Sequence, residues 1–278
     1  MLEILATLTS GVLVGLALGL TGSGGSLFAI PLLLYVVGLG MTEAVPISLL
    51  VVGATALLGA LSAFHRGLLL TRPTVIFGVA GILSAPLGLK LGGLTPEYWR
   101  IFGFSILALV MAARMAWQSF NLESTRIVRA GLEFDENAGI CRYAPDGKMH
   151  FSVPCALALV VTGASVGVLS GFFGVGGGFL IVPALMFVIR MDMPYAVGSS
   201  LAIIAMIGIA GGALAGIPIL LANVSAILFG AGSLAGMLGG RAISRNIAGP
   251  QLQQLFAFAL FTTGIFMIAQ LIGGHDDL

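Results

Sequence analysis

A glycine-rich motif occurs twice in this chain, 152 residues apart, and it constrains the fold more than any other feature of the sequence. The first copy is Gly22-Ser23-Gly24-Gly25-Ser26, followed by Pro31. The second copy is Gly174-Val175-Gly176-Gly177-Gly178, followed by Pro183. Residue n aligns with residue n+152 without a gap from Gly11 to Ala63. The chain is therefore predicted to contain two copies of one structural unit.

The composition indicates that this unit lies in a lipid bilayer. Apolar residues make up 58% of the chain and charged residues 8%, whereas a soluble domain carries roughly 25% charged residues. Apolar runs of about 18 or more residues recur, each long enough to cross a hydrocarbon core of about 30 Å. We therefore predict an all-α polytopic membrane protein. The net charge of +1 gives no reason to expect a nucleic-acid partner.

Each half is predicted to contain about five hydrophobic segments. They lie near residues 4–20, 26–39, 44–64, 73–90 and 98–118, and then near 153–172, 178–190, 195–216, 219–240 and 251–273. A hydrophilic stretch separates the two sets. This pattern divides the chain into a first membrane repeat (1–118), a charged linker (119–152) and a second membrane repeat (153–278).

The number of segments predicts that the two repeats are inverted, because an odd number of crossings reverses the second copy. Cytoplasmic loops carry an excess of Lys and Arg. With the linker in the cytoplasm, ten basic residues lie inside and only Lys90 and Arg100 lie outside. If each glycine motif instead interrupted a single crossing, the split would be seven to five. We expect a cytoplasmic linker and both termini outside, with Lys90 and Arg100 either snorkelling or attracting anions.

The segments that follow the two motifs, 26–39 and 178–190, are short. Fourteen helical residues reach only about 21 Å, too little for a comfortable crossing. We therefore expect broken or re-entrant helices at the glycine-rich motifs. Irregular backbone at membrane depth is tolerated only where it is buried in protein or lines a cavity.

Two helix N-termini brought together near the bilayer midplane would bind a small anion without a buried Lys or Arg, because their first amides lack helical acceptors and the helix dipole adds positive charge. Gly-interrupted segments at matching positions of two halves indicate a transporter's binding site. No metal or cofactor is expected. The candidate substrate-binding residues are Thr21, Gly22, Ser23, Gly24, Gly25, Ser26, Ser48, Gly174, Gly176, Gly177, Gly178, Ser199 and Ser200.

Close helix packing is the alternative explanation for glycines in membrane helices. It is the preferred interpretation for glycines at four-residue spacing, because that spacing forms a stripe on one helix face. These are Gly11, Gly15, Gly19, Gly163, Gly167 and Gly171.

The linker offers few structural signals. Residues 127–131 and 140–143 flank a turn signal at 135–137 and could form a small hairpin. The two cysteines, Cys141 and Cys155, have no metal or redox spacing, so free thiols are expected.

The two motifs, the second followed by Tyr195-Ala196-Val197-Gly198-Ser199-Ser200-Leu201, resemble the sulfite exporter TauE/SafE family. This resemblance covers nearly the whole chain. It implies transport of small sulfur oxyanions or organosulfonates, such as sulfite or sulfoacetate, across a bacterial inner membrane. The first copy differs in that Ser26 stands opposite Gly178 and Pro46 opposite Gly198, so the two half-sites would be chemically unequal.

Together these features predict a secondary transporter for a small sulfur-containing anion, working by alternating access as one repeat rocks against the other. A passive small-anion channel is the alternative. An enzyme is not expected, because the three histidines, His65, His150 and His275, are scattered. Proton coupling and homo-oligomer formation are left open.

Overall fold

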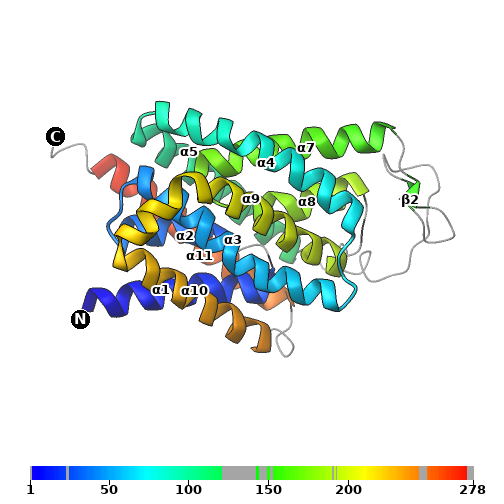
Figure 1. The fold of residues 1–278 in the computed structure, drawn as a ribbon. Coiled ribbons are helices and arrows are strands. Elements are labelled where there is room, and N and C mark those ends of the chain that lie inside the picture. Colours follow the sequence, from blue (N-terminus) through cyan, green and yellow to red (C-terminus); the bar gives the residue numbers. More distant parts are fainter. Residues whose placement is uncertain are drawn as a thin grey trace.

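Ten α-helices and one two-stranded sheet make up the described part of the chain (Figure 1). This computed structural model describes residues 2–22, 25–120, 142–143, 149–150, 153–189, 191, 193–243 and 249–273. The all-α prediction is confirmed for the membrane part, and each helix corresponds to one of the ten predicted segments, although α2 ends at Tyr35 and α9 extends to Ala222. They are α1 (Leu2–Thr21), α2 (Ser26–Tyr35), α3 (Met41–His65), α4 (Thr71–Leu94), α5 (Glu97–Phe120), α7 (Val153–Phe173), α8 (Gly178–Ile189), α9 (Met193–Ala222), α10 (Val224–Ile243) and α11 (Gly249–Gly273).

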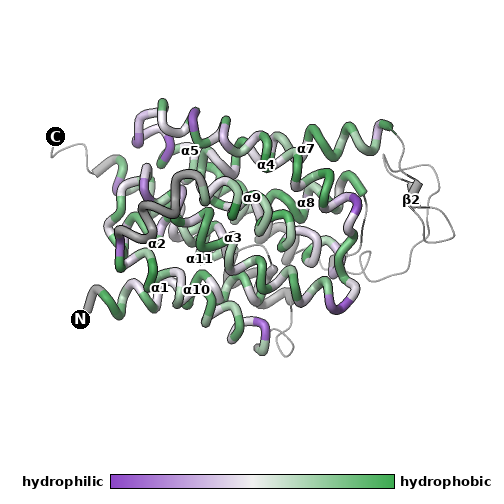
Figure 2. Tube along the Cα trace, in the orientation of Figure 1, coloured by the Kyte–Doolittle hydropathy of each residue, from purple (hydrophilic) through white to green (hydrophobic). Residues whose placement is uncertain are grey.

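The helices have the length and polarity of membrane spans. Within the described ranges, five are long and apolar enough to cross a bilayer: α3, α4, α7, α10 and the 194–213 part of α9. Hydrophilic residues gather at the two ends of the helix bundle, and apolar residues occupy its middle (Figure 2). Large apolar side chains such as Leu83 and Leu157 are exposed on its surface, which suits a lipid environment. The chain is a polytopic membrane protein.

The helices pack in pairs that join the two halves. α1 packs on α10, α4 on α7, α3 on α9, and α5 on α11. The 152-residue offset relates α1 to α7 and α10 to α4, so the first two pairs occupy corresponding positions. α1 begins at the left-hand end of the bundle in Figure 1, whereas α7 begins at the right-hand end. The α3–α9 pair lies at the centre, where most side chains of both helices are buried.

Small residues allow these pairs to approach closely. A Cβ added at Gly11 would collide with the backbone carbonyl of Phe229, and one at Gly163 would lie 2.6 Å from the carbonyl oxygen of Phe77. Phe77 and Phe229 are themselves 152 residues apart, so the same contact occurs in both halves. The packing interpretation is confirmed for all six glycines at four-residue spacing: Gly11, Gly15, Gly19, Gly163, Gly167 and Gly171.

Both glycine motifs separate a long helix from a short one. α1 ends at Thr21 before α2 begins at Ser26, and α7 ends at Phe173 before α8 begins at Gly178. With 10 and 12 residues, α2 and α8 are about 15 and 18 Å long. α2 folds back along α1, because a Cβ at Gly25 would lie 2.7 Å from the carbonyl oxygen of Val14. The two short helices therefore reach only about half-way across a hydrocarbon core.

The sheet lies in the linker and differs from the predicted hairpin. β1 (Arg142–Tyr143) pairs antiparallel with β2 (Met149–His150), so Arg142 faces His150. The predicted turn at 135–137 is therefore not the one that joins these strands. The sequence between them contains Pro145-Asp146-Gly147, a stronger turn signal. Residues 127–131, the other predicted strand, lie outside the described residues.

Cys155, in the first turn of α7, is disulfide-bonded, so the expectation of a free thiol is wrong at this position. The only other cysteine in the chain is Cys141, which lies outside the described residues. Spacing alone does not predict such a bond, because a disulfide requires two Cβ atoms to lie about 3.5–4.5 Å apart in the folded chain.

Candidate functional site

The two glycine motifs begin with equivalent left-handed turns. Gly22 has φ +74° and Gly174 has φ +71°, a conformation that side chains with a Cβ rarely adopt. The amide of Gly22 donates to the carbonyl of Leu18 at 2.7 Å, and that of Gly174 donates to the carbonyl of Ser170 at 2.8 Å. Leu18 and Ser170 are also 152 residues apart. In each half, therefore, the long helix is terminated in the same way.

The second motif then opens α8. Gly176 and Gly177 also have positive φ, at +66° and +68°. The carbonyl of Gly177 accepts hydrogen bonds from the amides of Leu180 (2.9 Å) and Ile181 (3.0 Å), so Gly177 is the N-cap of the helix. The amides of Gly178 and of the residue after it precede these donors and have no helical acceptor. They form the positive end of the α8 dipole.

Each glycine turn packs against the first turns of a long helix from the other half. A Cβ at Gly22 would collide with the side chain of Val197 on α9, and one at Gly174 would lie 2.7 Å from Cα of Val45 on α3. Val45 and Val197 correspond under the 152-residue offset. The Gly174 turn also approaches Ile30 of α2, since the added Cβ would lie 3.0 Å from its Cδ1 atom. The two short helices are thus brought to the central α3–α9 pair.

The serine hydroxyls differ between the halves. Ser48 on α3 donates to the carbonyl oxygen of Gly174 and so ties the second glycine turn to the first half. Its counterpart Ser200 donates instead to Val197 in its own helix, at 2.8 Å. The Ser199 hydroxyl accepts a hydrogen bond from the amide of Leu70, the residue before α4, at 3.2 Å. Ser48 therefore contacts a glycine turn, whereas Ser199 and Ser200 bond elsewhere.

The structure brings together the candidate substrate-binding glycines of the second motif. It does not describe every candidate residue of the first motif. Gly25 and Ser26 are buried at the start of α2, and Gly178 is buried at the start of α8. Gly25 has φ −63°, so it serves close packing on α1 and not a left-handed turn. Ser23 and Gly24 lie outside the described residues, as does the side chain of Thr21.

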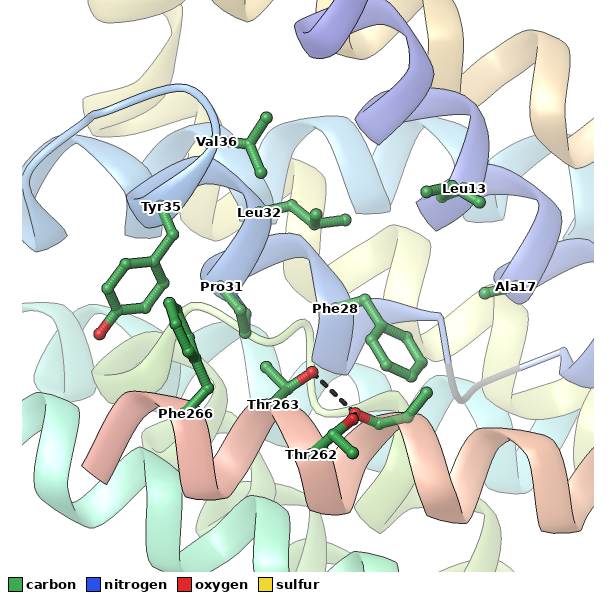
Figure 3. A pocket seen from close by; sticks show the side chains of 11 residues that line it. Leu13, Ala17, Phe28, Pro31, Leu32, Tyr35, Val36, Thr262, Thr263 and Phe266 are labelled. Atoms are coloured by element: carbon green, nitrogen blue, oxygen red, sulfur yellow. Dashed lines mark hydrogen bonds between the residues drawn. The ribbon is translucent and has the colours of Figure 1, made fainter. Parts of the chain in front are cut away.

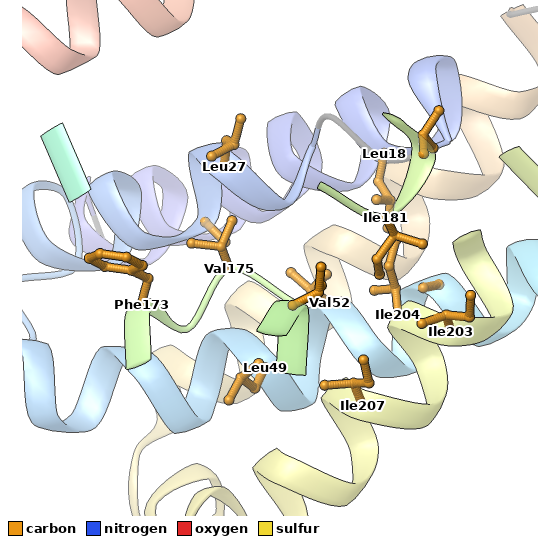
Figure 4. Close-up of a cluster of buried hydrophobic side chains, with 14 of the residues drawn as sticks. Leu18, Leu27, Leu49, Val52, Phe173, Val175, Ile181, Ile203, Ile204 and Ile207 are labelled. Carbon is orange, nitrogen blue, oxygen red and sulfur yellow. The ribbon is translucent and has the colours of Figure 1, made fainter. Parts of the chain in front are cut away.

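The surroundings of the second glycine turn are apolar (Figure 4). Val52 of α3 and Ile204 of α9 flank Gly176, at 3.3 and 3.4 Å from the position of an added Cβ. Val175 itself is buried among these side chains. The space beside Gly177, between α5, α7 and α8, is too narrow for a water molecule. The turn is therefore closed off from solvent in this conformation.

A larger opening lies between α1 and α2 of the first half and α11 of the second (Figure 3). It has a volume of about 500 Å³. Its two threonines, Thr262 and Thr263, bond to carbonyls of their own helix at 2.7–3.1 Å. Tyr35 and Phe266 meet edge to face across it, with ring centroids 5.2 Å apart. The walls are otherwise apolar, which suits lipid contact better than binding of an anion.

Sequence reasoning missed a charged contact at the start of α5. Arg100 is 4% exposed, and its Nη2 atom donates to the carbonyl of Met41 at 3.4 Å. The Glu97 carboxylate accepts a hydrogen bond from the amide of Met41 at 2.7 Å, so the side chains of Arg100 and Glu97 both bind the first residue of α3. Snorkelling is therefore wrong for Arg100. An Arg that follows a Trp at the start of a helix is typical of the membrane–water interface, and the sequence does not show that α3 covers this side chain.

Comparison with known proteins places the chain in a family. The sequence profile of "Sulfite exporter TauE/SafE" matches residues 7–267. A "Probable membrane transporter protein" of Xylella fastidiosa strain 9a5c is 35% identical over 213 residues, covering 74% of this chain and 72% of that protein. The "Probable membrane transporter protein YdhB" of Bacillus subtilis strain 168 is 26% identical over 201 residues, covering 72% and 74%. No solved structure matches the chain.

The helical bundle, its apolar middle and these relatives define the class of the protein, which is a transmembrane transporter. More narrowly, the chain belongs to the TauE/SafE sulfite exporter family, because the family profile covers nearly its whole length.

Proposed function

We propose that this protein is a secondary transporter that moves a small sulfur-containing anion across the bacterial inner membrane by alternating access. The observation that carries the proposal is the pair of left-handed glycine turns, Gly22 and Gly174, each packed against a central helix of the other half. Each turn precedes a short helix whose first amides can face an anion. The family supports sulfite as the substrate class, with organosulfonates such as sulfoacetate as close chemical relatives.

Alternating access is supported by the correspondence between the halves. The contacts of Gly11 with Phe229 and of Gly163 with Phe77 repeat at the 152-residue offset, and α1 and α7 enter the bundle from opposite ends. Two inverted repeats of this kind, residues 1–118 and 153–278, can exchange conformations and open one side of the site at a time. We place the linker, residues 119–152, in the cytoplasm and both termini outside, from the distribution of Lys and Arg.

A passive channel is the second candidate, because the same helix termini could coordinate an anion in a pore. The closed surroundings of the Gly174 turn favour a transporter, since a pore would need a continuous polar path. We propose no enzymatic activity and no cofactor. The transport assay described next also tests whether transport is coupled to protons.

The test is uptake of labelled sulfite, sulfoacetate and thiosulfate into proteoliposomes, with and without a pH gradient. Saturable uptake of at least one of them is expected, and stimulation by a gradient would identify proton coupling. Replacing Gly177 with Val should abolish the uptake, because the added side chain would meet Val166 and strain a residue at φ +68°. The absence of saturable flux for all three anions would contradict the proposed substrate class.

A further inference from the structure

One buried hydroxyl in the membrane part of the chain has no hydrogen-bond partner among the described residues. It is Oγ of Ser170, in the last turn of α7, and the residue is 1% exposed. Two other hydroxyls of the same helix bond to carbonyls one turn back, Ser165 to Val161 at 2.8 Å and Thr162 to Ala158 at 2.6 Å. The Ser170 hydroxyl could do the same but does not. A buried donor without a partner is unfavourable, so it calls for an explanation.

Ser170 lies directly against the second glycine motif. Its carbonyl accepts the amide of Gly174 at 2.8 Å and so anchors the beginning of the turn. A Cβ added at Gly177, the N-cap of α8, would lie 3.5 Å from Cβ of Ser170. The side chain lines the narrow space between α5, α7 and α8 together with Val175 and Gly177. The free hydroxyl therefore shares one space with the N-terminus of α8.

The equivalent space beside α2, the short helix that follows the first glycine motif, is open. The 152-residue offset relates Leu169, Leu180 and Leu107, which line the narrow space, to Ala17, Phe28 and Ala259, which line the 500 Å³ opening between α1, α2 and α11. The two corresponding spaces therefore differ in width, one wide and one too narrow for water. The residue equivalent to Ser170 is Leu18, which is fully buried. Only the second half places a hydroxyl at this point.

We propose that Ser170 is a substrate-binding residue, whose hydroxyl donates a hydrogen bond to an oxygen of the anion when the space between α5, α7 and α8 widens during transport. The inference rests on the proposed transport of a small oxyanion. In the closed form the hydroxyl has no partner, and in the open form the anion supplies one beside the amides that begin α8. Because Leu18 offers no equivalent donor, the second half would bind the anion more strongly than the first.

The experiment compares Ser170→Ala with Ser165→Ala in proteoliposomes, using labelled sulfite as the probe. Ser165 is the matched control, because it lies on the same helix but is exposed and bonded within the helix. Ser170→Ala should raise the KM for sulfite about 3- to 10-fold, the factor expected for one lost hydrogen bond. Its melting temperature in detergent should stay the same or rise, because an unpaired buried hydroxyl is removed. Ser165→Ala should change neither quantity.

The outcomes separate this inference from the proposed function. If the wild-type protein transports sulfite and Ser170→Ala leaves the KM unchanged, the role of Ser170 is overturned and the proposed function is not. A lower melting temperature with an unchanged KM would show that Ser170 serves packing only, which also overturns it. Absence of saturable sulfite uptake by the wild-type protein would overturn both proposals.

Discussion

Ser48 of α3 donates its hydroxyl hydrogen bond to the carbonyl oxygen of Gly174, and thereby joins the first half of the chain to the glycine turn of the second. The corresponding hydroxyl, Ser200, bonds within its own helix. The two half-sites are therefore unequal in their hydrogen bonding as well as in their sequences, and the difference lies at the place where we propose that the anion binds.

Replacing Ser48 with Ala should lower the free energy of unfolding by about 1–3 kcal/mol, because it leaves the buried carbonyl of Gly174 without this donor. Ser200→Ala is the matched control and should change stability by less than about 0.5 kcal/mol, since the Val197 carbonyl keeps its helical partner. Equilibrium unfolding in mixed detergent micelles measures both values. Equal losses in the two variants would argue against a special role for the Ser48 contact.

Gly174→Ala tests the glycine turn itself. The new Cβ would lie 2.7 Å from Cα of Val45, at a residue with φ +71°. Gly38→Ala is the matched control, because Gly38 has φ +76° and no atom within 4 Å of an added Cβ. The control should cost about 1–2 kcal/mol for its left-handed conformation alone. Gly174→Ala should cost more and should reduce anion uptake, so a loss no larger than that of Gly38→Ala would refute the close approach.

The contact between Glu97 and the first turn of α3 predicts a graded effect. Glu97→Gln retains an oxygen that can accept the Met41 amide, whereas Glu97→Ala does not. Both variants remove the negative charge near the buried Arg100, so their difference isolates the hydrogen bond. We expect Glu97→Ala to be less stable than Glu97→Gln by about 0.5–1.5 kcal/mol. Equal melting temperatures for the two variants would contradict this role.

The location of the linker can be tested by fusions. Ten of the twelve basic residues lie on the cytoplasmic side if the linker is inside. The disulfide at Cys155, just after the end of the linker, favours the opposite orientation of the chain in the membrane, because disulfides persist mainly in oxidising compartments. We expect alkaline phosphatase to be active when fused to the C-terminus and inactive when inserted in the linker. The reverse pattern would show that the disulfide, and not the charge distribution, reports the orientation.

The sequence predicted the helices well because hydrophobic length and glycine placement are local signals. The breaks before Ser26 and Gly178 follow directly from glycine clusters, and the packing of Gly11 on Phe229 follows from a four-residue spacing. Side-chain partners could not be predicted in the same way. Ser48 and Ser200 occupy equivalent positions, yet only Ser48 reaches a glycine turn.

Two other residues escaped prediction because neighbours distant in the sequence determine their environment. In the sequence Arg100 resembles an interfacial anchor, but in the structure α3 covers it and the Met41 carbonyl accepts its hydrogen bond. Ser170 resembles a small packing residue, and only the folded chain shows that its hydroxyl is buried without a partner beside Gly177.

Counterflow of labelled sulfite tests most directly whether this chain carries a small sulfur anion by alternating access. Proteoliposomes are preloaded with unlabelled sulfite, and the uptake of external labelled sulfite is followed without any ion gradient. We expect saturable uptake that is transiently faster with internal sulfite and is lost in Gly177→Val. Sulfite flux that is neither saturable nor stimulated by internal sulfite would identify a channel and rule out alternating access.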